Sequence, residues 1–251
     1  MSGWIAQRIR FTAFVNPSLE HDVENWWRAA VGEDPEVRTT KPRTGVVSQE
    51  SAKAGGRLIL RTEPGRIDWA LVAPEDPETD GIENLGEANN AIGLFVNFVR
   101  AWLDSEDRPR ATRLAYAPVL VQPVATREKG YELLAQYLKG TVTIDASKMQ
   151  EFLFQVNRPT TIAVGDASEL QISVNRLCKW SVANWTKVAL RAGADGAAVS
   201  SSATQSFACL LDMDINTVLS APLCVDQKQE REILGKLEEL AREISESGDP
   251  K

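Results

Sequence analysis

Two aspartates stand one residue apart near the end of an apolar run, SFACLLDMDINT. In a strand, alternation would place the carboxylates of Asp212 and Asp214 on one face. Two carboxylates so placed can share Mg²⁺ or Mn²⁺, because these cations prefer oxygen ligands. The pair would then support metal-dependent chemistry on phosphate esters or nucleotides. A third acidic ligand is normally needed, and the sequence designates none.

The same alternation has a plainer interpretation. The odd-numbered residues from Phe207 to Ile215 form a complete apolar face, whereas the even-numbered residues become polar toward the end of the run. This pattern is typical of a strand that leaves the covered part of its sheet. We therefore favour solvated aspartates, and we expect no catalytic residues and no cofactor, with Mg²⁺ or Mn²⁺ as the alternative.

Other catalytic patterns are poorly represented. The single histidine, His21, falls in the first turn of an expected helix, where an imidazolium is disfavoured. No nucleophile elbow accompanies it. The three cysteines are too few and too widely spaced for a disulfide framework or a zinc knuckle. The glycine-rich stretch AGADGAA lacks the Lys and Ser/Thr of a phosphate-binding loop.

A cationic cluster of Arg38, Lys41 and Arg43 occupies an early polar segment. Such a cluster could contact an anion or a nucleic acid. The chain carries a formal net charge of −7, which argues against non-specific binding of polyanions. We interpret the cluster as a solvated loop and keep nucleic-acid binding as a third functional option.

Seven tryptophans are candidates for packing or for protein contacts. Neighbours on a helix point about 100° apart, so Trp26 and Trp27 are not both expected to face inward. We expect one of them, with Trp27 as the candidate, and Trp185 to be partly exposed interface anchors. Gly193 and Gly196 lie in the segment 191–203, which is rich in Gly, Ala and Ser and is expected to be a flexible contact loop.

The strand and helix patterns predict an α+β fold with a mostly antiparallel sheet and helices on one face. Alternation predicts a strand at Ile5–Val15, a hairpin around Glu63-Pro64-Gly65, and a long strand from Leu170 to Val182 with a bend or bulge near Arg176. Helical spacing predicts helices near 19–31, 85–103, 126–138 and 226–245. Between 33 and 57 we expect at most one strand.

The order of elements suggests an internal duplication. Residues 45–103 and 150–246 are both predicted to run strand, strand, strand, helix, which we interpret as a duplicated βββα unit. We divide the chain into an α+β unit at 1–140 and a βββα unit at 141–251, packed together as one body.

These patterns favour a soluble, cytoplasmic protein without a membrane span. We expect a non-catalytic protein-interaction or assembly subunit, with an adaptor, regulatory or structural role. Its partner would be another protein or a second copy. The metal-dependent enzyme built on Asp212 and Asp214 is the alternative function, and a nucleic-acid-binding accessory protein is the third.

Overall fold

The computed structural model describes residues 3–17, 23–75, 81–165, 170–192, 199–218, 223 and 225–248, with the backbone alone for 189–192 and 199–202. The elements in chain order are β1 (Ile5–Val15), α1 (Val23–Val31), β2 (Val37–Lys41), β3 (Val46–Lys53), β4 (Gly56–Glu63), β5 (Arg66–Val72), α2 (Ala88–Leu103), β6 (Ala111–Val124), α3 (Arg127–Tyr137), β7 (Leu153–Asn157), β8 (Thr160–Val164), β9 (Leu170–Ala192), β10 (Val199–Thr217) and α4 (Gln227–Ser247).

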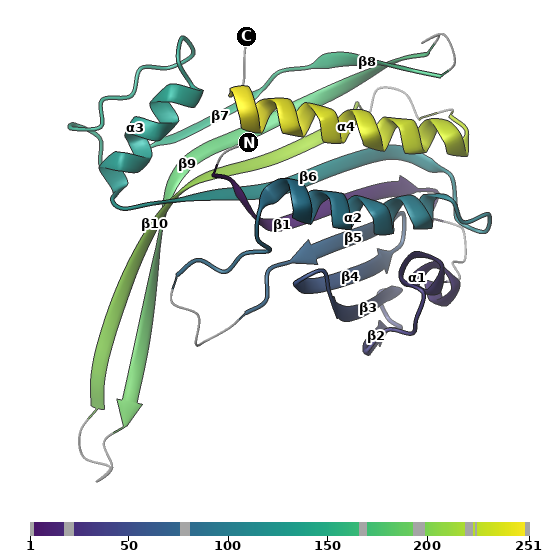
Figure 1. Cartoon of the computed structure of the whole chain (residues 1–251). Coiled ribbons are helices and arrows are strands. Elements are labelled where there is room, and N and C mark those ends of the chain that lie inside the picture. The colour runs from purple at the N-terminus through teal and green to yellow at the C-terminus, as the bar shows by residue number, and fades with distance from the viewer. Residues whose placement is uncertain are drawn as a thin grey trace.

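The strands of the described residues form one ten-stranded sheet in the order β2-β3-β4-β5-β1-β6-β10-β9-β7, with β8 also paired to β9. All the strand pairs are antiparallel. The helices cover one face of this sheet (Figure 1). The predicted α+β class with an antiparallel sheet and helices on one face is therefore confirmed.

Aromatic side chains fill the space between the sheet and the helices around α1 and α2. Trp102 of α2 lies edge-on to Trp26 of α1, with ring centroids 6.1 Å apart. Trp27 stacks on Trp69 of β5 at 5.9 Å. Both tryptophans of α1 are fully buried because this short helix is enclosed by the sheet on one side and by α2 on the other. The expectation that Trp26 or Trp27 is partly exposed is wrong.

Helix α4 carries an apolar stripe and a buried ion pair. Asp226 caps its start in a capping box with Gln229, and Ile233, Leu237 and Ile244 are fully buried. The buried Glu230 carboxylate pairs with Arg108 and accepts a hydrogen bond from the backbone N–H of Ala111 at 2.9 Å. This carboxylate therefore ties α4 to the segment between α2 and β6.

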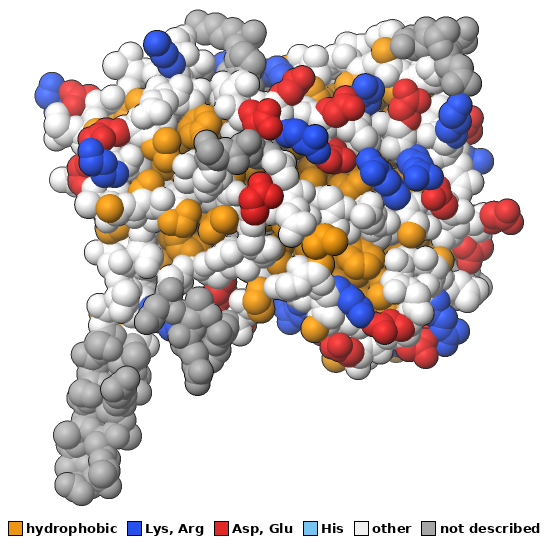
Figure 2. Space-filling view, viewed as in Figure 1, with side chains coloured by type: hydrophobic (Ala, Val, Ile, Leu, Met, Phe, Trp, Pro, Cys, Tyr) orange, Lys and Arg blue, Asp and Glu red, His pale blue; other side chains and the backbone are white. Residues whose placement is uncertain are grey.

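Figure 2 shows patches of hydrophobic side chains on the face that carries the helices, with acidic and basic side chains on the surface around them. No helix among the described residues is long and apolar enough to cross a membrane.

Three local predictions differ from the structure. The segment 33–57 contains two strands instead of one, because β2 is an edge strand whose residues are all exposed and show no apolar alternation. Strand β9 pairs with β10 from Val174 to Ala192 without a register shift, so there is no bulge at Arg176, and the bend given as the other possibility stays a prediction. The expected loop 191–203 is strand at both ends, since β9 runs to Ala192 and β10 starts at Val199.

The two halves follow a similar order of strand and helix, and the sheet is continuous across them. Strand β6 pairs with β1 on one side and with β10 on the other. Both β7 and β8 pair with β9, a feature without a counterpart in the first half. The duplicated βββα unit and the boundary at residue 140 stay predictions.

Candidate functional site

The most distinctive feature of the molecule is a long hairpin that leaves the sheet. Strand β10 pairs with β6 only from Phe207 onward, and β9 pairs with β7 only up to Ser181. Beyond these points residues 182–192 of β9 pair only with β10, and residues 199–206 of β10 pair only with β9. We call these two segments the arm. Figure 1 shows the arm extending away from the body at the lower left.

The described side chains of the arm are mostly in contact with solvent. Val188 is 58% exposed, a large fraction for an aliphatic side chain. The other exposed residues with described side chains are Asn184, Thr186, Ala203, Thr204 and Gln205. The arm can form a strand pair because most of its residues are small, β-branched or aromatic and none is proline. The two strands of the arm pair through their backbones, but the sequence of the arm provides no apolar layer that would cover its faces.

Helix α3 contacts the end of the arm next to the body, around Val182, which we call the foot of the arm. A Cβ atom on Gly130 would lie 2.7 Å from Cγ2 of Val182, so only glycine allows this close approach. The Cys209 thiol donates to the Gly130 carbonyl at a donor–acceptor distance of 3.2 Å. Burial raises the pKa of this thiol to about 12, so it is protonated at neutral pH and is not a ready nucleophile. The body therefore fixes where the arm emerges.

The opposite face of the sheet, which we call the open face, carries Arg8 and Arg10 on β1 and Asp212 and Asp214 on β10. Alternation places these side chains away from the buried Ile9, which faces the helices. On β10 the same parity buries Cys209, Leu211, Met213 and Ile215 on the helix side. The predicted assignment of the faces of β10 is confirmed.

Within the part of the chain that the structure describes, no third acidic ligand joins the aspartate pair. Asp214 accepts a hydrogen bond from the Asn216 side chain at 2.8 Å, and Asp212 lies opposite Lys179 on β9. Among the described residues no group of three His, Cys, Asp or Glu side chains could hold a metal ion. Two carboxylates with a neighbouring ammonium group are a weak cation site. The metal hypothesis stays a prediction without added support.

A hollow of about 310 Å³ lies at the foot of the arm on the open face. Trp185 and Leu210 form its apolar side and belong to a small cluster with Val121 and Ala208. Its charged lining consists of Arg8, Glu75, Glu83 and Asp212. Trp185 is half-buried, as expected for an amphipathic side chain between a core and solvent. The hollow can accept a polar or cationic side chain. Its lining residues do not include a catalytic nucleophile next to a general base.

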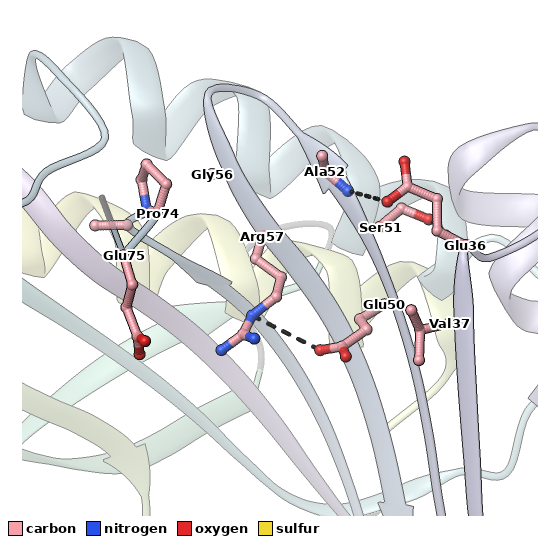
Figure 3. A pocket seen from close by; sticks show the side chains of 10 residues that line it. Glu36, Val37, Glu50, Ser51, Ala52, Gly56, Arg57, Pro74 and Glu75 are labelled. Carbon is pink, nitrogen blue, oxygen red and sulfur yellow. Dashed lines mark hydrogen bonds and ion pairs between the residues drawn. The ribbon is translucent and has the colours of Figure 1, made fainter. Parts of the chain in front are cut away.

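A second hollow, of about 430 Å³, lies beside β3 and β4 (Figure 3). Its carboxylates are separate: Glu36 accepts from the backbone N–H of Ala52 at 3.2 Å, and Glu50 lies 3.7 Å from the Arg57 guanidinium. Glu75 points away from both of them in Figure 3. These acids therefore do not converge on one point, as a metal centre or an acid–base pair would require.

The cationic cluster lies at one edge of the sheet. Arg38 and Lys41 belong to the edge strand β2, and Arg43 follows in the turn. Arg38 pairs with Glu24 of α1, which reduces the positive charge of the cluster. No aromatic side chain that could stack with bases stands between these three residues in the sequence. Because Arg38 and Lys41 are three residues apart in β2, alternation points them to opposite faces, so the structure does not strengthen the prediction of a nucleic-acid site here.

Of the predicted interface residues, Trp185 is at the foot of the arm and Trp27 is buried inside the chain, where it cannot reach a partner. Gly193, Gly196 and His21 lie outside the described residues. Sequence reasoning missed the arm itself. The available signal was the length of β9, which has no Gly or Pro between Leu170 and Ala192.

A comparison of the chain with protein-family models finds no match, and a comparison with curated protein sequences finds none either. The function is therefore argued from the geometry.

Proposed function

We propose that this chain is a non-catalytic subunit of a protein assembly and that the arm is the element through which it associates. The single observation behind the proposal is that each strand of the arm has an edge with no strand partner among the described residues, and that the arm has exposed side chains on its faces. The partner is a protein, either a second copy of the chain or a different one.

The physical support is the poor stability of such an element on its own. A two-stranded hairpin is only marginally stable in water, and three or more strands or a packed surface are needed for independent stability. Each free edge also presents unpaired N–H and C=O groups that can accept another strand. A long arm without a covering layer is therefore better suited to an assembled state than to an isolated one.

The proposal includes a reducing compartment such as the cytoplasm. Cys178 and Cys209 are buried thiols that form no disulfide, and thiols are kept reduced in compartments that are not oxidising.

The test is to shorten the arm. Trp185 and Ser206 are directly opposed, so residues 186–205 can be replaced by Asn-Gly to close a tight hairpin at that rung. Tagged full-length and shortened chains are purified from the native cells, and the proteins that accompany them are identified by mass spectrometry. Complexes are then rebuilt from purified components and their masses are measured by sedimentation.

We expect the full-length chain to associate with itself or with an identified protein, and the shortened chain to lose this association. An unchanged melting temperature of the shortened chain shows that the body is intact. Equal association of both chains would contradict the proposal, and so would a full-length chain that forms no complex.

A further inference from the structure

The described part of the sheet has four strand edges without a neighbouring strand. These are the outer edges of β2 and of β7 with β8, and the two sides of the arm, one on β9 and one on β10. Proteins usually protect such edges with charged residues, prolines or short, interrupted strands, because an unprotected edge pairs with other chains.

Three of the four edges carry this protection. Strand β2 contains Arg38 and Lys41 and is followed by Pro42. Strands β7 and β8 are short and are separated by Arg158 and Pro159. The β9 side of the arm contains Lys187 and Arg191.

The β10 side of the arm lacks such protection. Residues 199–211 contain neither a charged residue nor a proline, although the adjacent Asp212 and Asp214 are charged. The stretch Val199–Ser206 precedes the first rung with β6, so its outer N–H and C=O groups have no strand partner among the described residues. Ala203, Thr204 and Gln205 are exposed there. This is the one edge of the described sheet that is both free and uncharged.

We propose that the Val199–Ser206 edge of β10 pairs antiparallel with the same edge of a second copy. A twofold axis brings identical edges together and closes the assembly as a dimer. Two uncharged strands meet without like-charge repulsion, whereas pairing through the β9 side would bring Lys187 and Arg191 of both copies together. The result is a four-stranded ribbon in the order β9-β10-β10-β9. A ribbon of four strands is more stable than a two-stranded hairpin, which is only marginally stable by itself.

This inference rests on the proposed function, because it names the partner of the arm as a second copy. Its pairing length follows from the strand geometry. Centred on Ser202, the pairing covers the seven residues 199–205, which at about 3.4 Å per residue give a contact roughly 24 Å long.

The test uses a matched pair of lysine substitutions on one rung. Gln205 of β10 and Thr186 of β9 are directly opposed, and both are exposed and uncharged. The full chain and its Gln205→Lys and Thr186→Lys variants are compared by sedimentation equilibrium from ~1 to ~100 μM, a range that brackets micromolar dissociation constants. We expect a dimer for the wild type. Gln205→Lys should raise the dissociation constant about tenfold or more, since lysine protects an edge, while Thr186→Lys should leave it within about twofold.

A second measurement locates the contact. In the ribbon, Ser202 lies near the twofold axis, so Ser202→Cys should form an intermolecular disulfide under mild oxidation and Thr186→Cys should not. Cys178 and Cys209 are buried and give little background.

A monomeric wild type across this range would overturn the self-pairing. Equal weakening by the two lysine variants, or equal crosslinking by the two cysteine variants, would overturn the choice of the β10 edge. If the wild type is monomeric but the shortened arm loses a complex with a different protein, the proposed function stands and the self-pairing fails.

Discussion

The two halves of β10 form one continuous strand in two different environments. The inner half, Phe207–Thr217, lies between β6 and β9 and buries Leu211 and Ile215 under the helices. The outer half, Val199–Ser206, pairs only with β9 and has no helix above it. Backbone pairing continues across both halves, but apolar burial stops at the boundary.

The difference shows which part of the fold is self-sufficient. The inner half is stabilised by burial of its own side chains, which supplies most of the stability of a sheet. Apart from Val199, the outer half is a run of Ser, Thr, Ala and Gln with little apolar area to bury. It therefore depends on a partner for any further stabilisation.

The largest expected effect is on the inner half. Leu211→Ala removes a fully buried side chain and should lower the free energy of unfolding by roughly 2–5 kcal/mol. Val188→Ala, in the exposed outer part of β9, should change it by about 0.5 kcal/mol or less in the monomer. Urea denaturation at low protein concentration measures both. Similar losses for the two variants would mean that the arm is packed like the core.

A smaller effect concerns pH and the Cys209 thiol of the inner half. In the unfolded chain a thiol ionises near pH 8.5, whereas burial raises the pKa of Cys209 to about 12 in the folded chain. The folded state therefore holds its proton more strongly, and this contribution is full below pH 8.5 and is lost as pH rises toward 12. Between those pH values the thiol lowers the free energy of unfolding of the wild type by roughly 1.4 kcal/mol for each pH unit. The Cys209→Ala variant lacks this thiol, so its free energy of unfolding should fall less steeply by that amount.

Urea denaturation at several pH values between 8 and 11 checks this slope. Burial also raises the pKa of Tyr116, so both proteins should lose stability in alkali, and the comparison between them isolates the thiol. Identical slopes would show that Cys209 is accessible to solvent.

The smallest expected effect is on the aspartate pair of the inner half. Mg²⁺ or Mn²⁺ should shift the melting temperature of the wild type and of the Asp212→Asn/Asp214→Asn variant equally, because the described residues offer no third acidic ligand. Thermal-shift titrations measure this. Stabilisation of the wild type alone would restore the metal-dependent enzyme as the better hypothesis.

The sequence predicts well those elements whose apolar residues recur at regular intervals or whose ends carry clear turn or capping residues. Strand β1 has the predicted bounds Ile5–Val15, and the turn at Pro64-Gly65 joins β4 to β5 as expected. Helix α4 begins at Gln227, one residue after the predicted start at 226. In each case the residues that determine the local structure are also the ones that are buried or capped, so the sequence carries the information directly.

The missed features depend on contacts distant in sequence. Trp27 is buried because β5 supplies Trp69 to stack on it, and no helical period reveals that layer. Strand β2 exists through its pairing with β3 and not through an apolar face. The sequence predicts a flexible loop at 191–203 in the outer part of the arm, because a segment rich in Gly, Ala and Ser is typical of flexible connections. Local composition could not distinguish such a loop from an exposed strand.

Hydrogen exchange of individual backbone amides in the full-length chain, followed by NMR at low and high protein concentration, tests the central claim most directly. In residues 199–206, alternate amides point away from β9. We predict that these outward amides become protected as the protein concentration rises, while the outward amides of residues 182–192 continue to exchange rapidly. Outward amides of β10 that exchange as fast as an unstructured peptide at every concentration would contradict the pairing of this edge with a second copy.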